Sequence, residues 1–111
     1  MNRKIERLIR KEAEKSVCRH KHGSVITFKG SILRSGRNRI KWPRASLHAE
    51  IDVILGVPRK LLPNCVLYVG RISAAGKFVN SKPCRRCTNL IRRIVKSVYY
   101  TNEEGKWTKL F

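Results

Sequence analysis

Acidic residues are scarce in this chain of 111 residues: 7 Asp and Glu stand against 26 Lys and Arg, which gives a formal net charge of +19. No acid occurs between Asp52 and Glu103. A domain this positive repels itself, and a bound polyanion relieves the repulsion. Because neutralised phosphates release counterions, nucleic acid is the usual polyanion. The charge therefore predicts contact with nucleic acid or phosphate; a role in solubility alone is the alternative.

Long apolar runs are also missing. None reaches the roughly 18 residues that a membrane-spanning helix needs, and no apolar block typical of a secretory signal follows the basic N-terminus. The hydrophobic content of 41% is nevertheless high enough for a folded core. We therefore expect residues 1–111 to form one domain that makes no use of a membrane and works inside the cell, in the cytoplasm or nucleus.

Cysteines are few, and their spacing argues against a disulfide framework. The four are Cys18, Cys65, Cys84 and Cys87, an even number that a secreted disulfide protein would also have. Without a secretory signal, and with the last two in a C-x-x-C spacing suited to a metal, free thiols in a reducing compartment are expected. Cys18 and Cys65 are interpreted as small buried hydrophobes.

Apolar periodicity predicts three helices, over residues 2–17, 47–55 and 84–96. In the first, Val17 continues the apolar stripe; Ser46 is the expected cap of the second; Leu90 and Ile91 belong to the core stripe of the third. Five runs rich in β-formers predict strands, at residues 24–29, 31–35, 65–72, 97–101 and 106–110.

The order of these elements predicts an α/β fold: a layered α/β sandwich around one mixed five-stranded sheet with about three helices. Only about four residues join the last two predicted strands, and so short a link permits only an antiparallel hairpin. The chain is therefore expected to end in an antiparallel C-terminal hairpin.

One group of residues carries chemistry. Cys84 and Cys87 lie three apart at the start of a predicted helix, so both sulfurs share a face, and the positive end of the helix favours their thiolate form. His48 can supply a third ligand for Zn²⁺, which leaves one tetrahedral position for water, as in catalytic zinc sites. Such a water becomes a usable nucleophile near neutral pH. Glu50, two residues after His48, is placed to move its proton.

Two other interpretations of the cysteine pair stay open. A structural zinc site would need a fourth ligand, for which the candidates are His20, His22, Cys18 and Cys65. A redox C-x-x-C is the second alternative, but it would leave His48 and Glu50 without roles.

The pattern His48-Ala49-Glu50 followed by Pro83-Cys84-Arg85-Arg86-Cys87 matches H-x-E…P-C-x-x-C, the signature of zinc nucleobase deaminases. Over nearly its whole length the chain resembles the cytidine deaminase superfamily. The resemblance implies that His48, Cys84 and Cys87 bind zinc and that Glu50 is the proton shuttle. It also implies substrate contacts, from Asn38 in Gly36-Arg37-Asn38, from the backbone N–H of Ala49 and from the backbone carbonyl near Lys82.

The resemblance leaves the substrate open. His-Ala-Glu is similar to deoxycytidylate, tRNA adenosine and polynucleotide deaminases, whereas an antiparallel end is similar to free-cytidine and toxin-type enzymes. Binding of a neutral nucleoside does not require a net charge of +19, and only a polymer of phosphates uses a broad basic surface. Trp42 is placed to stack an unpaired base. The basic residues expected to contact nucleic acid near the mouth of the site are Arg37, Arg39, Lys41, Arg44, Arg85 and Arg86, together with Lys82.

We therefore predict a zinc-dependent hydrolase that deaminates cytosine to uracil in single-stranded DNA or RNA. The first alternative is a deaminase of free cytidine, deoxycytidine, CMP or dCMP. The second is a nucleic-acid-binding module whose zinc is only structural. Because relatives in the superfamily often assemble into dimers or tetramers, a homo-oligomer is a further implication of the resemblance.

Overall fold

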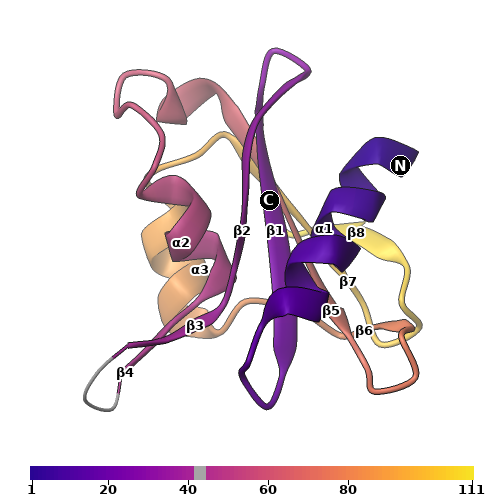
Figure 1. Cartoon of the computed structure of the whole chain (residues 1–111). Coiled ribbons are helices and arrows are strands. Elements are labelled where there is room, and N and C mark those ends of the chain that lie inside the picture. Colours follow the sequence, from indigo (N-terminus) through magenta and orange to yellow (C-terminus); the bar gives the residue numbers. More distant parts are fainter. Residues whose placement is uncertain (42–44) are drawn as a thin grey trace.

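The computed structural model describes residues 1–41 and 45–111 (Figure 1). Its main sheet has the strand order β2–β1–β5–β7–β8, with the short β6 paired to β5. The bounds of these strands are β1 Lys21–Phe28, β2 Ser31–Arg37, β5 Cys65–Ile72, β6 Phe78–Val79, β7 Ser97–Thr101 and β8 Trp107–Lys109. β1 is antiparallel to β2 and β5, β5 is parallel to β7, and β7 is antiparallel to β8. The mixed sheet and the C-terminal hairpin predicted from the sequence are confirmed, and β6 is an addition.

Helices cover both faces of this sheet, which makes three layers. α1 (Arg3–Lys15) lies on one face, and α2 (Ala49–Ile54) and α3 (Arg85–Arg92) lie together on the other (Figure 1). A 3₁₀ turn at Leu62–Asn64 leads into β5. The short strands β3 (Arg39–Lys41) and β4 (Ala45–Leu47) form a separate pair between β2 and α2. The predicted α/β sandwich with three helices is therefore confirmed.

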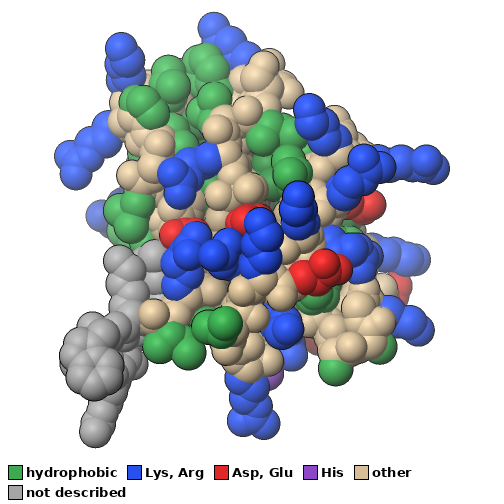
Figure 2. Space-filling model, in the orientation of Figure 1, with side chains coloured by type: hydrophobic (Ala, Val, Ile, Leu, Met, Phe, Trp, Pro, Cys, Tyr) green, Lys and Arg blue, Asp and Glu red, His purple; other side chains and the backbone are tan. Residues whose placement is uncertain are grey.

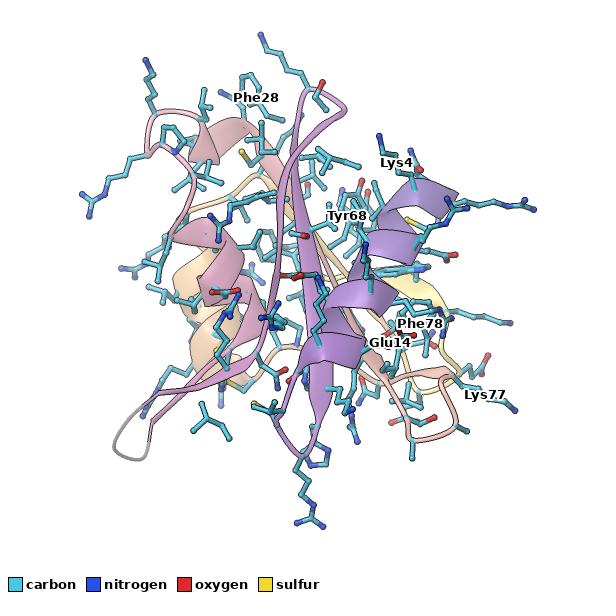
Figure 3. The ribbon with its side chains drawn as sticks, in the orientation of Figure 1. Lys4, Glu14, Phe28, Tyr68, Lys77 and Phe78 are labelled. Atoms are coloured by element: carbon cyan, nitrogen blue, oxygen red, sulfur yellow. The ribbon has the colours of Figure 1, made fainter. Side chains whose placement is uncertain are left out.

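Alternation along the strands divides the core in two, because successive side chains point to opposite faces of a sheet. Val25 packs with Ile5 and Ile9 under α1, whereas its neighbour Ile26 packs with Val53 and Ile91 under α2 and α3. Aromatic rings complete the α1 side. Tyr68 and Phe78 lie there (Figure 3), and the Tyr68 ring stacks on Tyr99 with centroids 5.3 Å apart.

α1 approaches β1 so closely that only glycine fits at the crossing. A Cβ added to Gly23 would collide with the carbonyl oxygen of Ile9. The helix begins at a capped end, where the Asn2 side chain accepts a hydrogen bond of 2.8 Å from the Lys4 amide. The close approach of α1 to Gly23 holds the helix against the sheet. The end of α1, where the segment that leads to β1 begins, is held with it.

Three sequence predictions on the helices are corrected. Ser46 does not cap α2: it lies in β4, and His48 is the N-cap residue. Val17 lies beyond the end of α1 and is 80% exposed. Leu90 is 50% exposed, because the buried stripe of α3 runs through Cys87 and Ile91, one helical turn apart. In the case of Val17, the helix is shorter than apolar periodicity alone suggested, whereas Leu90 lies within α3 but on its exposed face.

Basic side chains project from the visible face over α1, β2 and the helical layer, with few acids between them (Figure 2). Several of the acids are buried or paired, since Glu12, Glu50 and Asp52 are each less than a tenth exposed. The positive charge at the surface is therefore less balanced than the composition alone suggests. Within the residues that the structure describes, no helix is both long and apolar enough to cross a membrane.

Candidate active site

Three side chains from two helix starts converge on one point. One ligand atom each of His48, Cys84 and Cys87 lies within 4.8 Å of the others, and the His48 Nδ1 atom is 3.1 Å from the Cys87 Sγ atom. One imidazole nitrogen and two thiol sulfurs are donors that Zn²⁺ prefers. Within residues 1–41 and 45–111, no fourth His, Cys, Asp or Glu joins the group. The predicted three-ligand zinc site is thus assembled by the fold.

The positions of the three ligands follow from the local structure. His48 and Cys84 are the N-cap residues of α2 and α3, in extended backbone conformation, and Cys87 is one turn into α3. The start of α2 is attached to the sheet by Ser24, whose buried hydroxyl donates a 2.7 Å hydrogen bond to the Ala49 carbonyl. The start of α3 is held by Thr88, whose amide donates to the Cys84 carbonyl over 2.8 Å. Packing of both helices on the same face brings the ligands together.

The two thiols lie in different environments. The Cys84 Sγ accepts a hydrogen bond of 3.4 Å from the Cys87 amide, and this contact lowers the pKa of the Cys84 thiol. Burial raises the pKa of the Cys87 thiol. A bound divalent cation offsets the cost of burying the charged thiolate, because a thiol that coordinates a metal loses its proton outright. The pair is therefore suited to binding a cation in a partly buried position.

Glu50 lies in the first turn of α2 and is only 4% exposed. Burial raises the pKa of its carboxyl group above the ordinary value. It lines the same cavity as His48 and Cys84 but does not belong to the convergent ligand group. A buried carboxyl beside a three-ligand site can exchange protons with whatever occupies the cavity.

Two of the ligands, His48 and Cys84, line a cavity of about 380 Å³, within the range of roughly 300–1,000 Å³ for small-molecule pockets. Its lining comes from the α1–β1 connection, the end of β2, the start of α2 and the segment before α3, and consists of Cys18, Arg19, His20, His22, Asn38, His48, Ala49, Glu50, Ser81, Lys82, Pro83 and Cys84. Elements far apart in the sequence thus build a single concave site around the ligands.

Four of the predicted substrate and catalytic residues lie in this lining: Asn38, Ala49, Glu50 and Lys82. The predicted stacking residue Trp42 and the predicted contact Arg44 lie outside the described residues, as does the side chain of Lys41. These three stay predictions.

The other predicted nucleic-acid contacts do not line the cavity. Arg37 forms a 3.4 Å ion pair with Glu12, and Arg39 forms a 3.1 Å ion pair with Asp52. Arg85 and Arg86 are exposed at the start of α3. Carboxylates of α1 and α2 thus bind these two guanidinium groups, and contact of Arg37, Arg39, Arg85 and Arg86 with nucleic acid stays a prediction.

Sequence reasoning missed one wall of the cavity. Arg19, His20 and His22 were not assigned to the substrate, although all three line the site. Burial lowers the pKa of His22 to about 4, and the positive charge of Arg71 acts in the same direction. Arg19 and His20 lie in an irregular connection with no periodicity, and His22 is the second residue of β1. The only signal in the sequence was the pair of histidines two residues apart.

No family model matches the sequence, and no curated protein matches it. Solved structures do. The cytidine deaminase from Burkholderia pseudomallei superposes with a TM-score of 0.71 at 17% identity, over 98% of this chain and 91% of that one. The cytidine deaminase from Mycobacterium leprae gives 0.60 at 18% identity, over 96% and 90%. The dCMP deaminase from the cyanophage S-TIM5 gives 0.59 at 26% identity, over 93% and 86%.

These similarities extend over almost the entire chain, so they concern the whole arrangement of sheet and helices and not one shared motif. They agree with the order of motifs in the sequence, where His48 begins one helix and Cys84 begins another on the same face of the sheet. The chain thus has the fold of the cytidine deaminase superfamily, as its motifs predicted.

Proposed function

We propose that this protein hydrolytically deaminates the cytosine of a phosphate-bearing substrate, to give uracil and ammonia. The observation that carries the proposal is the convergence of His48, Cys84 and Cys87 at a cavity that Glu50 also lines. A structural zinc site would be closed by a fourth protein ligand. A group of three ligands, two of which line a cavity, is what a hydrolytic centre needs. The similarity in fold to cytidine and dCMP deaminases supports the same reaction.

His48, Cys84 and Cys87 are the residues that would hold the zinc ion. When bound at such a site, zinc acts as a Lewis acid that makes water nucleophilic near neutral pH. The N-cap position of Cys84 and the buried position of Cys87 hold the two sulfur donors at the start of α3, and the N-cap position of His48 holds the imidazole at the start of α2.

Glu50 is the proton carrier in this proposal. In the net reaction a bond forms between the water oxygen and C4 of cytosine, the bond from C4 to the exocyclic nitrogen breaks, and that nitrogen leaves as ammonia. Glu50 carries both protons of the attacking water in turn, the first to the ring nitrogen N3 of the base and the second to the leaving amino nitrogen. Its burial, at 4% exposure, keeps the carboxyl away from bulk water.

Backbone and side-chain groups around Glu50 are proposed to orient the base. The N–H of Ala49 is expected to donate to the base carbonyl oxygen, and the carbonyl near Lys82 to accept from the amino group. Both residues line the cavity. Asn38 lines it too, but most of its amide is already bonded within the protein.

Single-stranded nucleic acid is the first substrate candidate. The net charge of +19 far exceeds what one mononucleotide needs. Exposed cations lie at the cavity, from Arg19 and Lys82, and beside it at the start of α3, from Arg85 and Arg86. A polymer passing over the cavity would meet all four groups, and binding would then fall steeply with salt.

A mononucleotide such as dCMP is the second candidate. The dCMP deaminase from cyanophage S-TIM5 has 26% identity with this chain over 93% of its length. The cavity of about 380 Å³ is of a size for one nucleotide, and Arg19 and Lys82 are sufficient cations for one phosphate. In this case the remaining charge would serve another purpose, such as solubility.

One side-by-side assay tests the proposal and separates the candidates. Ammonia release by the zinc-loaded protein is measured on cytidine, dCMP, single-stranded DNA and single-stranded RNA, at several salt concentrations. Faster turnover of an oligonucleotide, with strong inhibition by salt, supports the polymer. Faster turnover of dCMP overturns the polymer in favour of the mononucleotide, and faster turnover of cytidine shows that phosphate is not required. If none of the four releases ammonia, the proposed function is wrong.

A further inference from the structure

The wall of the cavity opposite the helix starts comes from a connection without regular secondary structure. Residues 16–20 join α1 to β1, and Cys18, Arg19, His20 and His22 from this region line the cavity. A segment of this kind has no ladder of hydrogen bonds to fix it. Its shape therefore depends on specific side-chain contacts.

Asn38, just after β2, makes those contacts with both parts of its amide. Its Oδ1 atom accepts hydrogen bonds from the Ser16 hydroxyl over 2.6 Å and from the His22 amide over 3.0 Å. Its Nδ2 atom donates to the His20 carbonyl over 2.5 Å. The Asn38 backbone amide also donates to the His22 carbonyl over 3.3 Å. One side chain thus joins the first residue of the connection, Ser16, to its last, His20, and to His22 at the start of β1.

Ser16 extends this network from the far side. It is 3% exposed and does not line the cavity. Its hydroxyl, besides binding Asn38, accepts a hydrogen bond of 3.2 Å from the Cys18 amide. Because Ser16 belongs to the network but not to the cavity lining, any effect of Ser16 on substrate must pass through the connection.

The side-chain amide of Asn38 has little capacity left. Its oxygen already accepts two hydrogen bonds, and its Nδ2 atom contacts both the His20 carbonyl and, at 3.5 Å, the Nδ1 atom of His22. Only asparagine and glutamine combine an acceptor and a donor in this way, and asparagine is the shorter of the two. Because the amide is already hydrogen-bonded within the protein, a role in holding the structure is favoured over a direct contact with substrate.

We propose that Asn38 is a positioning residue, which controls substrate affinity by holding residues 16–22 as the second wall of the cavity. This inference rests on the proposed function, because it assigns a role in binding the substrate of that site. Arg19, His20 and His22 are the groups that the network presents to the substrate. The metal ligands, on α2 and α3, lie outside the network, so the chemical step is expected to change little when it is broken.

The experiment compares Asn38→Asp, Ser16→Ala and the double variant. Asn38→Asp keeps an oxygen that can accept from Ser16 and from the His22 amide. It replaces the Nδ2 donor by a second oxygen, which cannot donate to the His20 carbonyl. Ser16→Ala removes one partner without touching the cavity. Asn64→Asp, at an exposed position at the end of the 3₁₀ turn, is the matched control for the added negative charge. Zinc content and thermal unfolding are recorded for every variant.

Kinetics on dCMP and on a cytosine-containing oligonucleotide give the first result. We expect KM to rise about fivefold in each single variant, the equivalent of one hydrogen bond, with kcat within about twofold. The effects in the double variant should combine to less than their product, because both act on one network. Normal KM in Ser16→Ala beside a raised KM in Asn38→Asp would overturn the inference and show that Asn38 acts by touching substrate.

Binding gives a second result that does not need turnover. The dissociation constants of dCMP and the oligonucleotide are measured by calorimetry in a Glu50→Gln background, with and without the Ser16 and Asn38 changes. Weaker binding in the variants supports the inference even if the chain proves not to be a deaminase. Unchanged binding, or no binding of either probe to the parent protein, overturns it. If Asn38→Asp does not fold, Ser16→Ala alone decides.

Discussion

The Nδ1 atom of His48 lies 3.1 Å from the Sγ atom of Cys87, although 39 residues separate them in the chain. The contact joins the N-cap residue of α2 to the first turn of α3. Two helix starts meet at one cavity because both helices pack on the same face of the sheet. This relationship turns two short motifs into a three-ligand site.

The first prediction concerns metal binding. Cys87→Ser should lose zinc during dialysis against a chelator. Deamination should fall by more than about 100-fold, because even mutation of residues that only hydrogen-bond to metal ligands costs up to about 100-fold. Cys18→Ser is the matched control, since Cys18 lines the cavity but does not belong to the ligand group. Zinc is measured by atomic absorption. Loss of zinc in Cys18→Ser would indicate a fourth ligand and favour a structural site.

The second prediction concerns the proton carrier. Glu50→Gln keeps the size of the buried side chain but removes its ability to accept a proton, and should lower kcat by about 10²–10⁴-fold. Zinc content and oligonucleotide binding should stay as in the parent. Glu14→Gln, at an exposed position on α1, controls for the change of charge. Unchanged ammonia release by Glu50→Gln would exclude the assigned role.

The motifs predicted more of the site than of the elements around it. His48, Glu50 and the C-x-x-C pair were found because their chemistry depends on residue type and short spacing. The start of α2 was placed too early, since residues 45–47 pair with residues 39–41 as strands before the helix begins. Nothing local distinguishes these two outcomes, because the pairing partner decides between them.

The cavity wall opposite the helices could not be predicted for a different reason. Residues 16–20 have neither helical nor strand periodicity, so their position depends on Asn38, at least 18 residues further along the chain. The sequence did draw attention to Asn38, through Gly36-Arg37-Asn38, but as a substrate contact. Its bonds to Ser16, His20 and His22 are tertiary contacts that no local pattern encodes.

The third prediction follows from His22, whose pKa burial lowers to about 4. Between about pH 6.5 and 4 the unfolded chain binds a proton at this residue that the folded chain does not. Stability should therefore fall as pH decreases through this window, with a slope from His22 of at most about 1.4 kcal/mol per pH unit, less because the ring is partly exposed.

Urea unfolding at a series of pH values measures this slope. His22→Gln should flatten the curve between pH 6.5 and 4 relative to the parent, whereas His20→Gln, at an exposed position, should leave it unchanged. Comparing variants removes contributions that all of them share, such as loss of zinc in acid. An identical slope in His22→Gln and the parent would contradict the assignment.

The fourth prediction concerns the contact of α1 with the sheet. Gly23→Ala places a methyl group against the Ile9 carbonyl, and the helix must move away. We expect a loss of about 1–3 kcal/mol in the free energy of unfolding, as for overpacked sites. Ser31→Ala, at the exposed start of β2, is the control. Chemical denaturation checks the values, and equal stability of both variants would show that α1 adjusts at no cost.

X-ray absorption at the zinc edge is the decisive measurement, because it identifies the atoms that surround the metal. We expect one zinc ion bound by two sulfurs at about 2.3 Å and by lighter atoms at about 2.0–2.1 Å, namely one imidazole nitrogen and one solvent oxygen. In Cys87→Ser one sulfur should be lost. A zinc ion surrounded by four protein ligands, or a protein that binds no zinc, would contradict the three-ligand site.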